Sequence, residues 1–173
     1  MSDASKPSKA AETETPEEAG PELGQYGQVL KSKGLSPIAH EPDAKGIETI
    51  ELTRDELIRA AEILRDDCQF DFLLVVAGVD MKDYRQTVTH LYSLETHETL
   101  ALKVKADDNE ALPSLTSIWP AADWHEREAY DLMGIHFEGH PDLRRILMPV
   151  DWIGHPLRKD YVENDPRLVW NKR

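Results

Sequence analysis

The chain has 173 residues, of which 40% are hydrophobic, which is enough for one domain with a modest core and some tail. Its formal net charge of −13 argues against a nucleic-acid surface, because phosphate binding needs a basic face, and favours a protein or small-molecule partner. The single cysteine, Cys68, excludes an internal disulfide and a cysteine-rich zinc or iron–sulfur site supplied by this chain alone.

Residues 1–22 are predicted to form a disordered acidic tail. They hold six acidic residues and two lysines, with no aromatic and no branched aliphatic side chain, so they cannot bury enough apolar surface to offset the entropy lost on ordering. They also lack the apolar core of a signal peptide, and no later apolar run approaches the ~20 residues that span a bilayer. We therefore expect any membrane association to come through a partner or a small surface contact.

The first elements of the predicted domain are two helices and a strand. A short helix is predicted around residues 23–33, ending at Gly34, and an extended connection follows at residues 36–37 because Ser36 precedes a proline. Residues 47–52 alternate weakly and indicate a short edge strand. Residues 53–56, Thr-Arg-Asp-Glu, have the form of a capping box and predict the start of a helix that packs one face on a sheet.

Three strands are predicted in the middle of the chain. Residues 70–79 read Phe-Asp-Phe-Leu-Leu-Val-Val-Ala-Gly-Val, a run typical of a central strand covered on both faces. Alternating segments at 87–94 and 99–105 add two more strands, and the three form an antiparallel meander. Because the helices and strands do not alternate regularly, we predict an α+β fold, with a small mixed or antiparallel sheet packed with helices, over residues 23–137.

A charged helix is predicted to begin at Pro120, in its first turn, and to end just before Gly134. Glu126, Arg127 and Glu128 are consecutive on it. At about 100° per residue they sweep about 200° of the circumference, so they cannot all face one partner.

Two interpretations of this charged helix remain open. Glu126, Glu128 and Asp131 resemble the paired carboxylates of a general acid/base site. The same residues also suit a structural ion-pair helix, in which Arg127 reaches Asp131 four positions later. We favour the structural interpretation, because the sequence offers no nearby nucleophile and structural networks also perturb pKa values.

The histidines near this helix raise the question of a metal site. His125 is followed by Glu-Arg-Glu, which lacks the second histidine four residues on that the helical zinc motif requires. His136 and His140 are four residues apart, but Gly139 and Pro141 favour a loop, so hydrogen-bonded loop histidines are the preferred interpretation. No glycine-rich phosphate loop follows a predicted strand, and we expect no nucleotide site.

Residues 138–173 are predicted to be an extended C-terminal tail that lies on a partner subunit. They contain four prolines, and their seven Lys/Arg and six Asp/Glu make them nearly neutral. A segment so rich in proline forms no sheet or long helix of its own, yet its apolar residues are too many to be left in water. It should therefore lie along a protein surface.

Basic pairs and one tryptophan are the notable side chains of this tail. Arg144-Arg145 and Arg158-Lys159 could each bind a phosphate, but anchoring the tail to acids such as Glu126 or Glu128 is the better use of them. Trp152 is either an ordinary packed residue or an interface anchor, a role in which tryptophan is enriched.

A spaced pattern that begins on the charged helix is similar to a known family signature. It runs from Glu-Arg-Glu-Ala-Tyr-Asp-Leu-Met at 126–133 to His-Pro-Asp-Leu-Arg-Arg-Ile-Leu at 140–147, and resembles the signature of the 30-kDa subunit family of respiratory complex I. Residues 146–161 extend the resemblance, in the form most like the subunit J branch found in the NAD(P)H–plastoquinone oxidoreductase (NDH-1) of cyanobacteria and chloroplasts. The residues on which the resemblance rests, and which it implies are interface residues, are Glu126, Arg127, Glu128, Asp131, His140, Pro141, Arg144, Arg145, Trp152, Pro156, Arg158, Lys159, Asp160 and Tyr161.

The resemblance implies a non-catalytic, cofactor-free subunit of the hydrophilic arm of NDH-1. In such a complex electrons pass from ferredoxin or NAD(P)H through iron–sulfur clusters in neighbouring subunits to plastoquinone, coupled to proton translocation, and serve respiration, cyclic electron flow and carbon concentration. The implied partners are the 49-kDa-like quinone-pocket subunit and the iron–sulfur subunits, and the implied place is the cytoplasmic side of the thylakoid membrane. Two other hypotheses are a free-standing acidic hydrolase that uses Glu126 and Glu128, and an acidic adaptor unrelated to redox chemistry.

Overall fold

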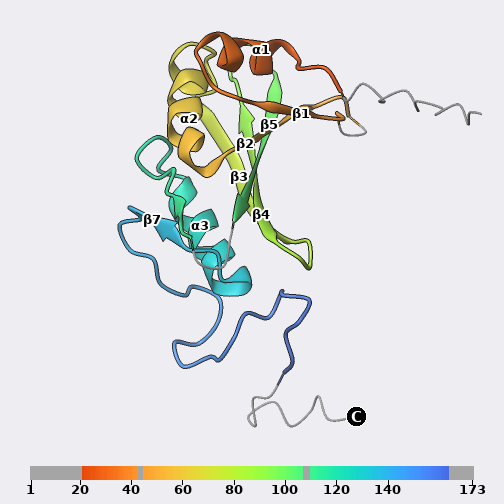
Figure 1. Ribbon diagram of the computed structural model, residues 1–173. Helices are drawn as coiled ribbons and strands as arrows, with labels where there is room; N and C mark the ends of the chain where they lie inside the picture. The colour runs from red at the N-terminus through yellow and green to blue at the C-terminus, as the bar shows by residue number, and fades with distance from the viewer. Residues whose placement is uncertain (1–20, 43–44, 107–109, 164–173) are drawn as a thin grey trace, which may run out of the picture.

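The fold is α+β, as the sequence predicts, and is built on one five-stranded sheet (Figure 1). The computed structural model describes residues 21–42, 45–106 and 110–163. The acidic segment predicted to be disordered lies outside the described residues, apart from Pro21 and Glu22, and so do the last ten residues of the tail. The helices and strands in chain order are α1 (Gln25–Ser32), β1 (Ile38–His40), β2 (Glu48–Leu52), the 3-10 turn η1 (Arg54–Glu56), α2 (Leu57–Asp66), β3 (Phe72–Asp80), β4 (Arg85–Tyr92), β5 (Thr99–Ala106), β6 (Leu112–Pro113), α3 (Ala122–Met133) and β7 (Phe137–Glu138).

The sheet has the strand order β1-β2-β5-β4-β3. The predicted meander is confirmed, because β3 pairs with β4 and β4 with β5 in antiparallel fashion. The sheet is mixed, since β2 pairs with β5 in parallel, and β6 and β7 form a separate parallel pair. From Thr87 onward β4 alternates: Thr87, Thr89 and Leu91 are buried and Val88, His90 and Tyr92 are half-buried, as expected of a strand with one covered face.

Two strand positions differ from the prediction. The strand predicted at the edge, β2, lies between β1 and β5, because the extended connection after α1 pairs with it as β1. The strand predicted to be central, β3, lies at the end of the sheet, with Phe72 48% and Leu74 43% exposed. A register shift between Leu73 and Val75 breaks its alternation, so its apolar run serves both the core and the exposed surface.

The core lies between the sheet and the helices. Figure 1 shows α2 and α3 on the same side of the sheet, with α1 above them. Leu64 of α2, Leu91 of β4 and Leu102 of β5 are fully buried in one apolar cluster with Phe70. Trp119 joins this cluster and donates its indole N–H to the carbonyl of Phe70 at 3.1 Å, which fixes the segment that leads into α3.

The helix ends follow the sequence signals. The predicted capping box is present at η1, where Glu56 accepts the Thr53 hydroxyl at 2.8 Å and the Thr53 amide at 3.5 Å. At α1 the cap comes from another element, since the Glu48 carboxylate of β2 accepts the amides of Tyr26 at 3.2 Å and Gly27 at 2.8 Å. A Cβ at Gly24 would lie 2.4 Å from the Glu48 carboxyl carbon, which explains the glycine at that turn.

Replacing Glu48 by alanine is expected to lower the free energy of unfolding by about 1–2 kcal/mol, as for the loss of a helix N-cap. The reason is that two amides in the first turn of α1 lose their acceptor. Urea unfolding measures the effect, with alanine at the exposed Glu41 as the control for removing one negative charge. Equal stability of the two variants would contradict the capping role.

Candidate functional site

The site is the surface around α3, where the tail returns to the domain. On this helix Glu126 and Asp131 are fully buried, Arg127 is 7% exposed and Glu128 is exposed. The three consecutive charges therefore face different surroundings, as the helical geometry predicts. Each of the buried charged groups has its own set of partners.

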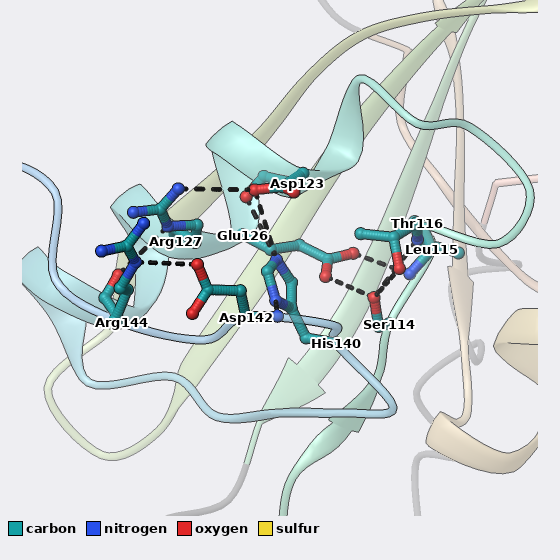
Figure 2. Close-up of polar contacts among 9 residues, drawn as sticks. All are labelled: Ser114, Leu115, Thr116, Asp123, Glu126, Arg127, His140, Asp142 and Arg144. Carbon is teal, nitrogen blue, oxygen red and sulfur yellow. Dashed lines mark hydrogen bonds and ion pairs between the residues drawn. The ribbon is translucent and has the colours of Figure 1, made fainter.

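Glu126 faces the segment that follows β6. Its two carboxylate oxygens accept the Ser114 hydroxyl and the Leu115 amide, both at 2.7 Å (Figure 2). Burial raises the pKa of Glu126, although these two hydrogen bonds act in the opposite direction. Among the described residues Glu126 is hydrogen-bonded to its own domain instead of to a tail arginine, and Glu128 is exposed; that Glu128 receives a donor from a partner subunit stays a prediction.

Arg127 faces the start of the tail. Its guanidinium lies 3.7 Å from the Asp123 carboxylate, donates from Nε to the Arg144 carbonyl at 3.2 Å and stacks 5.0 Å from the Trp124 ring centroid. The predicted pair with Asp131 is not formed, because Arg127 reaches back one turn instead of forward. Both directions have the same four-residue spacing, and Asp131 is taken by the tail.

His140 is a loop residue with both ring nitrogens engaged. Nδ1 accepts the Asp142 amide at 3.0 Å, and Nε2 lies 3.3 Å from the Asp123 carbonyl oxygen. An amide can only donate, so Nδ1 is the acceptor in the first contact, and Nε2 also lies 3.8 Å from the Asp123 carboxylate. No group of three or more potential metal ligands occurs among the described residues.

Asp131 binds the tail through a cluster of donors that we call the Asp131 clasp. One carboxylate oxygen accepts the consecutive amides of Ile146, Leu147 and Met148 at 3.0, 2.7 and 2.9 Å. The other accepts Nη1 of Arg145 at 2.6 Å. Burial alone would raise the pKa of Asp131, but the three amides and the guanidinium outweigh it and hold the pKa below its usual range.

The tail also caps the C-terminal end of α3. Gly134 closes the helix in the left-handed conformation, with φ +71°, and the last helical carbonyls need other donors. All three donors come from the tail. The carbonyls of Asp131, Leu132 and Met133 accept, respectively, His155 Nδ1 at 2.9 Å, the Leu157 amide at 3.1 Å and Arg158 Nε at 2.8 Å.

A second carboxylate fixes the tail farther along. Asp80, at the end of β3, accepts the amides of Lys159 at 2.7 Å and Lys82 at 2.8 Å, and these bonds lower its pKa. His155 has a lowered pKa because burial disfavours its charged form, although its bond to the Asp131 carbonyl acts in the opposite direction. The first part of the tail therefore lies on this chain's own domain.

The rest of the tail surface faces outward. Of the predicted interface residues, Pro141, Arg144, Lys159 and Asp160 are exposed, and Arg145, Trp152, Pro156, Arg158 and Tyr161 are half-buried. Large apolar side chains of the tail are also exposed, and they are Leu147 at 53%, Val150 at 95%, Ile153 at 89%, Leu157 at 54% and Val162 at 69%. Five exposed large apolar side chains within residues 147–162 are more than an isolated exposed residue, and favour a protein–protein contact.

The family signature lies on this arrangement. Residues 50–167 match the sequence model of the family described as respiratory-chain NADH dehydrogenase, 30 Kd subunit. The chain belongs to this 30-kDa subunit family. The family predicted from the signature is thereby confirmed.

Three relatives illustrate the match, and each is named as a subunit of an NADH-quinone oxidoreductase. The relative from Phenylobacterium zucineum is 40% identical over 143 residues, covering 81% of this chain and 68% of the relative. The relative from Acidithiobacillus ferrooxidans is 45% identical over 129 residues, covering 68% of this chain and 64% of the relative. The relative from Geotalea uraniireducens is 38% identical over 141 residues, covering 79% and 86%. The chain thus spans about two thirds of the first two relatives and most of the third.

A solved structure has a similar fold. A chain of the membrane-bound sulfane sulfur reductase, an archaeal respiratory membrane complex, superposes with a TM-score of 0.62 at 22% identity, covering 78% of this chain and 82% of that one. At this identity the likeness concerns the fold alone.

The geometry does not favour the hydrolase hypothesis. Glu126 is buried and bound to Ser114 and Leu115, whereas Glu128 is exposed on another side of α3, so they do not form a facing pair of carboxylates.

Sequence reasoning missed Asp80 and His155, whose partners are distant in the chain. Asp123 was also missed, although its spacing of four residues from Arg127 was a usable signal.

Proposed function

We propose that this member of the 30-kDa subunit family is a structural, non-catalytic subunit of the peripheral arm of a quinone-reducing membrane complex. The observation that carries the proposal is the tail, whose backbone is held by Asp131 and Asp80 while its apolar side chains face outward. A segment ordered in this way presents a preformed surface, so little conformational entropy is lost when a partner binds.

The chemistry of the complex is proposed from the relatives. Their name, NADH-quinone oxidoreductase, supports electron transfer from a nicotinamide cofactor to a quinone. Iron–sulfur clusters and the quinone would be held by neighbouring subunits, because Cys68 alone cannot supply the four thiolates of a cluster. The proposed partners are the 49-kDa-like quinone-pocket subunit and the iron–sulfur subunits.

A finer proposal concerns the photosynthetic form of the complex. The signature at residues 126–161 has the form seen in the plastoquinone-reducing NDH-1, which supports ferredoxin or NAD(P)H as donor, plastoquinone as acceptor and coupled proton translocation. Extraction of the purified complex and identification of its bound quinone by mass spectrometry test this. Ubiquinone or menaquinone in place of plastoquinone would refute the finer proposal and leave the coarser one standing.

The route to the membrane is part of the proposal. No helix among the described residues is long and apolar enough to cross a bilayer. We infer that the chain joins the membrane peripherally, through the complex, on the cytoplasmic side and, in the photosynthetic form, at the thylakoid. Immunogold labelling of cell sections with an antibody to this chain tests the location.

Changing the outward face of the tail is expected to abolish assembly without unfolding the domain. Truncation at Pro149 would remove the donors that cap α3. A loss of assembly in that variant could therefore come from lost docking or from lost stability. The double substitution Val150→Asp and Ile153→Asp, at positions 95% and 89% exposed, leaves those donors in place. Burying two aspartates against an apolar partner should prevent docking, because each buried charge without a partner is costly.

The measurement is recovery of iron–sulfur and membrane subunits when the tagged full-length chain is purified from cells. Leu94→Asp, at a position 57% exposed in the turn between β4 and β5, is the matched control and should co-purify normally. Normal recovery with the double variant would contradict the proposal. Recovery of no redox proteins, even with the unchanged chain, would favour an adaptor unrelated to redox chemistry.

A further inference from the structure

Glu126 is a buried carboxyl group that the assembly role does not require. It has 0% exposure, and Figure 2 shows its side chain directed toward residues 114–116 and away from Arg127. Both oxygens are hydrogen-bonded, one to the Ser114 hydroxyl and one to the Leu115 amide. The carboxyl group therefore sits in a prepared polar pocket within the domain.

Burial is the largest influence on this carboxyl group, and the charges that face it act in opposite directions. The ionisable groups that face it are Asp123 on α3 and His140 from the segment after β7. Asp123 acts to raise the pKa of Glu126 and His140 acts to lower it, while the guanidinium of Arg127 is paired with Asp123. The loss of hydration on burial outweighs the hydrogen bonds and the His140 effect, so the neutral form of the carboxyl group is favoured.

A chain of hydroxyl groups connects Glu126 with the protein surface. The Ser114 hydroxyl lies 2.7 Å from Glu126 and 2.8 Å from the hydroxyl of Thr116, and either hydroxyl can be the donor in the second contact. Thr116 is half-exposed. When Glu126 is ionised, Ser114 donates to it and accepts from Thr116. When Glu126 is protonated, its O–H donates to Ser114, which turns and donates to Thr116.

We propose that Glu126 is a proton-binding site, which takes up and releases one proton through the hydroxyls of Ser114 and Thr116. Uptake forms one O–H bond on the carboxylate, consumes one proton from solvent and changes the charge of the domain by one. The site joins three segments, because Ser114 precedes α3, Glu126 lies on it and His140 follows β7.

The first test is a carbon NMR titration of the side-chain carboxyl groups in the full-length chain, with Glu126→Gln to assign the signal. The expected result is a midpoint above the ~4.3 of an unperturbed glutamate. Glu128→Gln, on the exposed side of the same helix, is the matched control and should leave the Glu126 midpoint unchanged. A Glu126 midpoint at or below the unperturbed value would overturn the proposal.

Two hydroxyl variants test the relay by the sign of their effects. Ser114→Ala removes a donor to the ionised carboxylate and should raise the midpoint. Thr116→Val removes the acceptor that Ser114 uses when Glu126 is protonated, whereas in the ionised form Ser114 still accepts the backbone amide of residue 116 at 3.2 Å, so the midpoint should fall. Shifts of the same sign, or none, would refute the relay.

The pH dependence of stability tests proton binding even if a hydroxyl variant folds poorly. In the window between the unperturbed and the raised pKa the folded state binds more protons than the unfolded state, so stability should fall as pH rises. The unchanged chain should show this loss relative to Glu126→Gln in urea unfolding. A difference between the two that does not vary with pH would also count against proton binding.

Discussion

Replacing Asp131 by alanine is expected to lower the free energy of unfolding by about 3–5 kcal/mol, the usual cost of breaking a buried ion pair from one side. Asp131 is fully buried and its carboxylate is the shared acceptor of Arg145 and three tail amides. Without it the half-buried guanidinium of Arg145 keeps only backbone carbonyl acceptors and loses its counter-charge, and residues 146–148 lose the acceptor that holds them.

The same clasp predicts an acid limit to the stability of the tail. The pKa of Asp131 is lower in the folded chain than in the unfolded chain, so the folded state binds fewer protons. Its contribution is therefore complete above the unfolded pKa of about 3.9 and is lost as pH falls through the lower folded value. Folding lowers the pKa of Asp131 and raises the pKa of Glu126. The contributions of these two acids to stability therefore change with pH in opposite directions.

Hydrogen exchange at residues 146–148 is the direct measurement for Asp131→Ala, together with urea unfolding. Asp131→Asn is the closer test. It keeps one oxygen as acceptor for the three amides, but it loses the negative charge that pairs with Arg145 and turns an amide N–H donor toward the guanidinium. The control is Glu128→Ala, which removes an exposed carboxylate from the same helix. Unchanged protection of these amides in Asp131→Ala would show that the clasp does not hold the tail.

Patterns among residues close in sequence predicted the helices and strands well, but they did not predict the order of the strands in the sheet. The capping box at η1 and the Gly34 and Gly134 helix ends depend on neighbours within a few residues, and the sequence shows them directly. The place of β3 depends on which strand pairs with it, and its apolar run is equally suited to the centre or to an edge with one exposed apolar face.

The site shows the same division between local and distant information. Helical geometry predicted that Glu126, Arg127 and Glu128 face different ways, and they do. It left open whether Arg127 pairs with the acid before it or after it, and the tail decides this by occupying Asp131. The signature at residues 126–147 contains both Asp131 and the start of the tail segment that it binds. The spacing of these residues alone does not show that they are in contact.

Replacing Gly134 by alanine should cost about 2–4 kcal/mol in the free energy of unfolding. At φ +71° a side chain is strained by about 1–2 kcal/mol. A Cβ there would also lie 2.5 Å from Arg158 Nη2 and 2.7 Å from the His155 ring. These side chains must move, and the hydrogen bonds they donate to the end of α3, worth about 1 kcal/mol each, are weakened.

Gly139→Ala separates these two effects. Gly139 has φ +80°, but a Cβ there meets nothing within 4 Å, so only the backbone strain of about 1–2 kcal/mol remains. Exchange of the Leu157 amide, which donates to the Leu132 carbonyl, should speed up in Gly134→Ala and stay unchanged in Gly139→Ala. If both variants lose the same stability and keep the Leu157 amide protected, the tail does not depend on its caps at α3. If the Leu157 amide exchanges faster only in Gly134→Ala, the absence of a side chain at residue 134 is what allows the tail to pack against the end of α3.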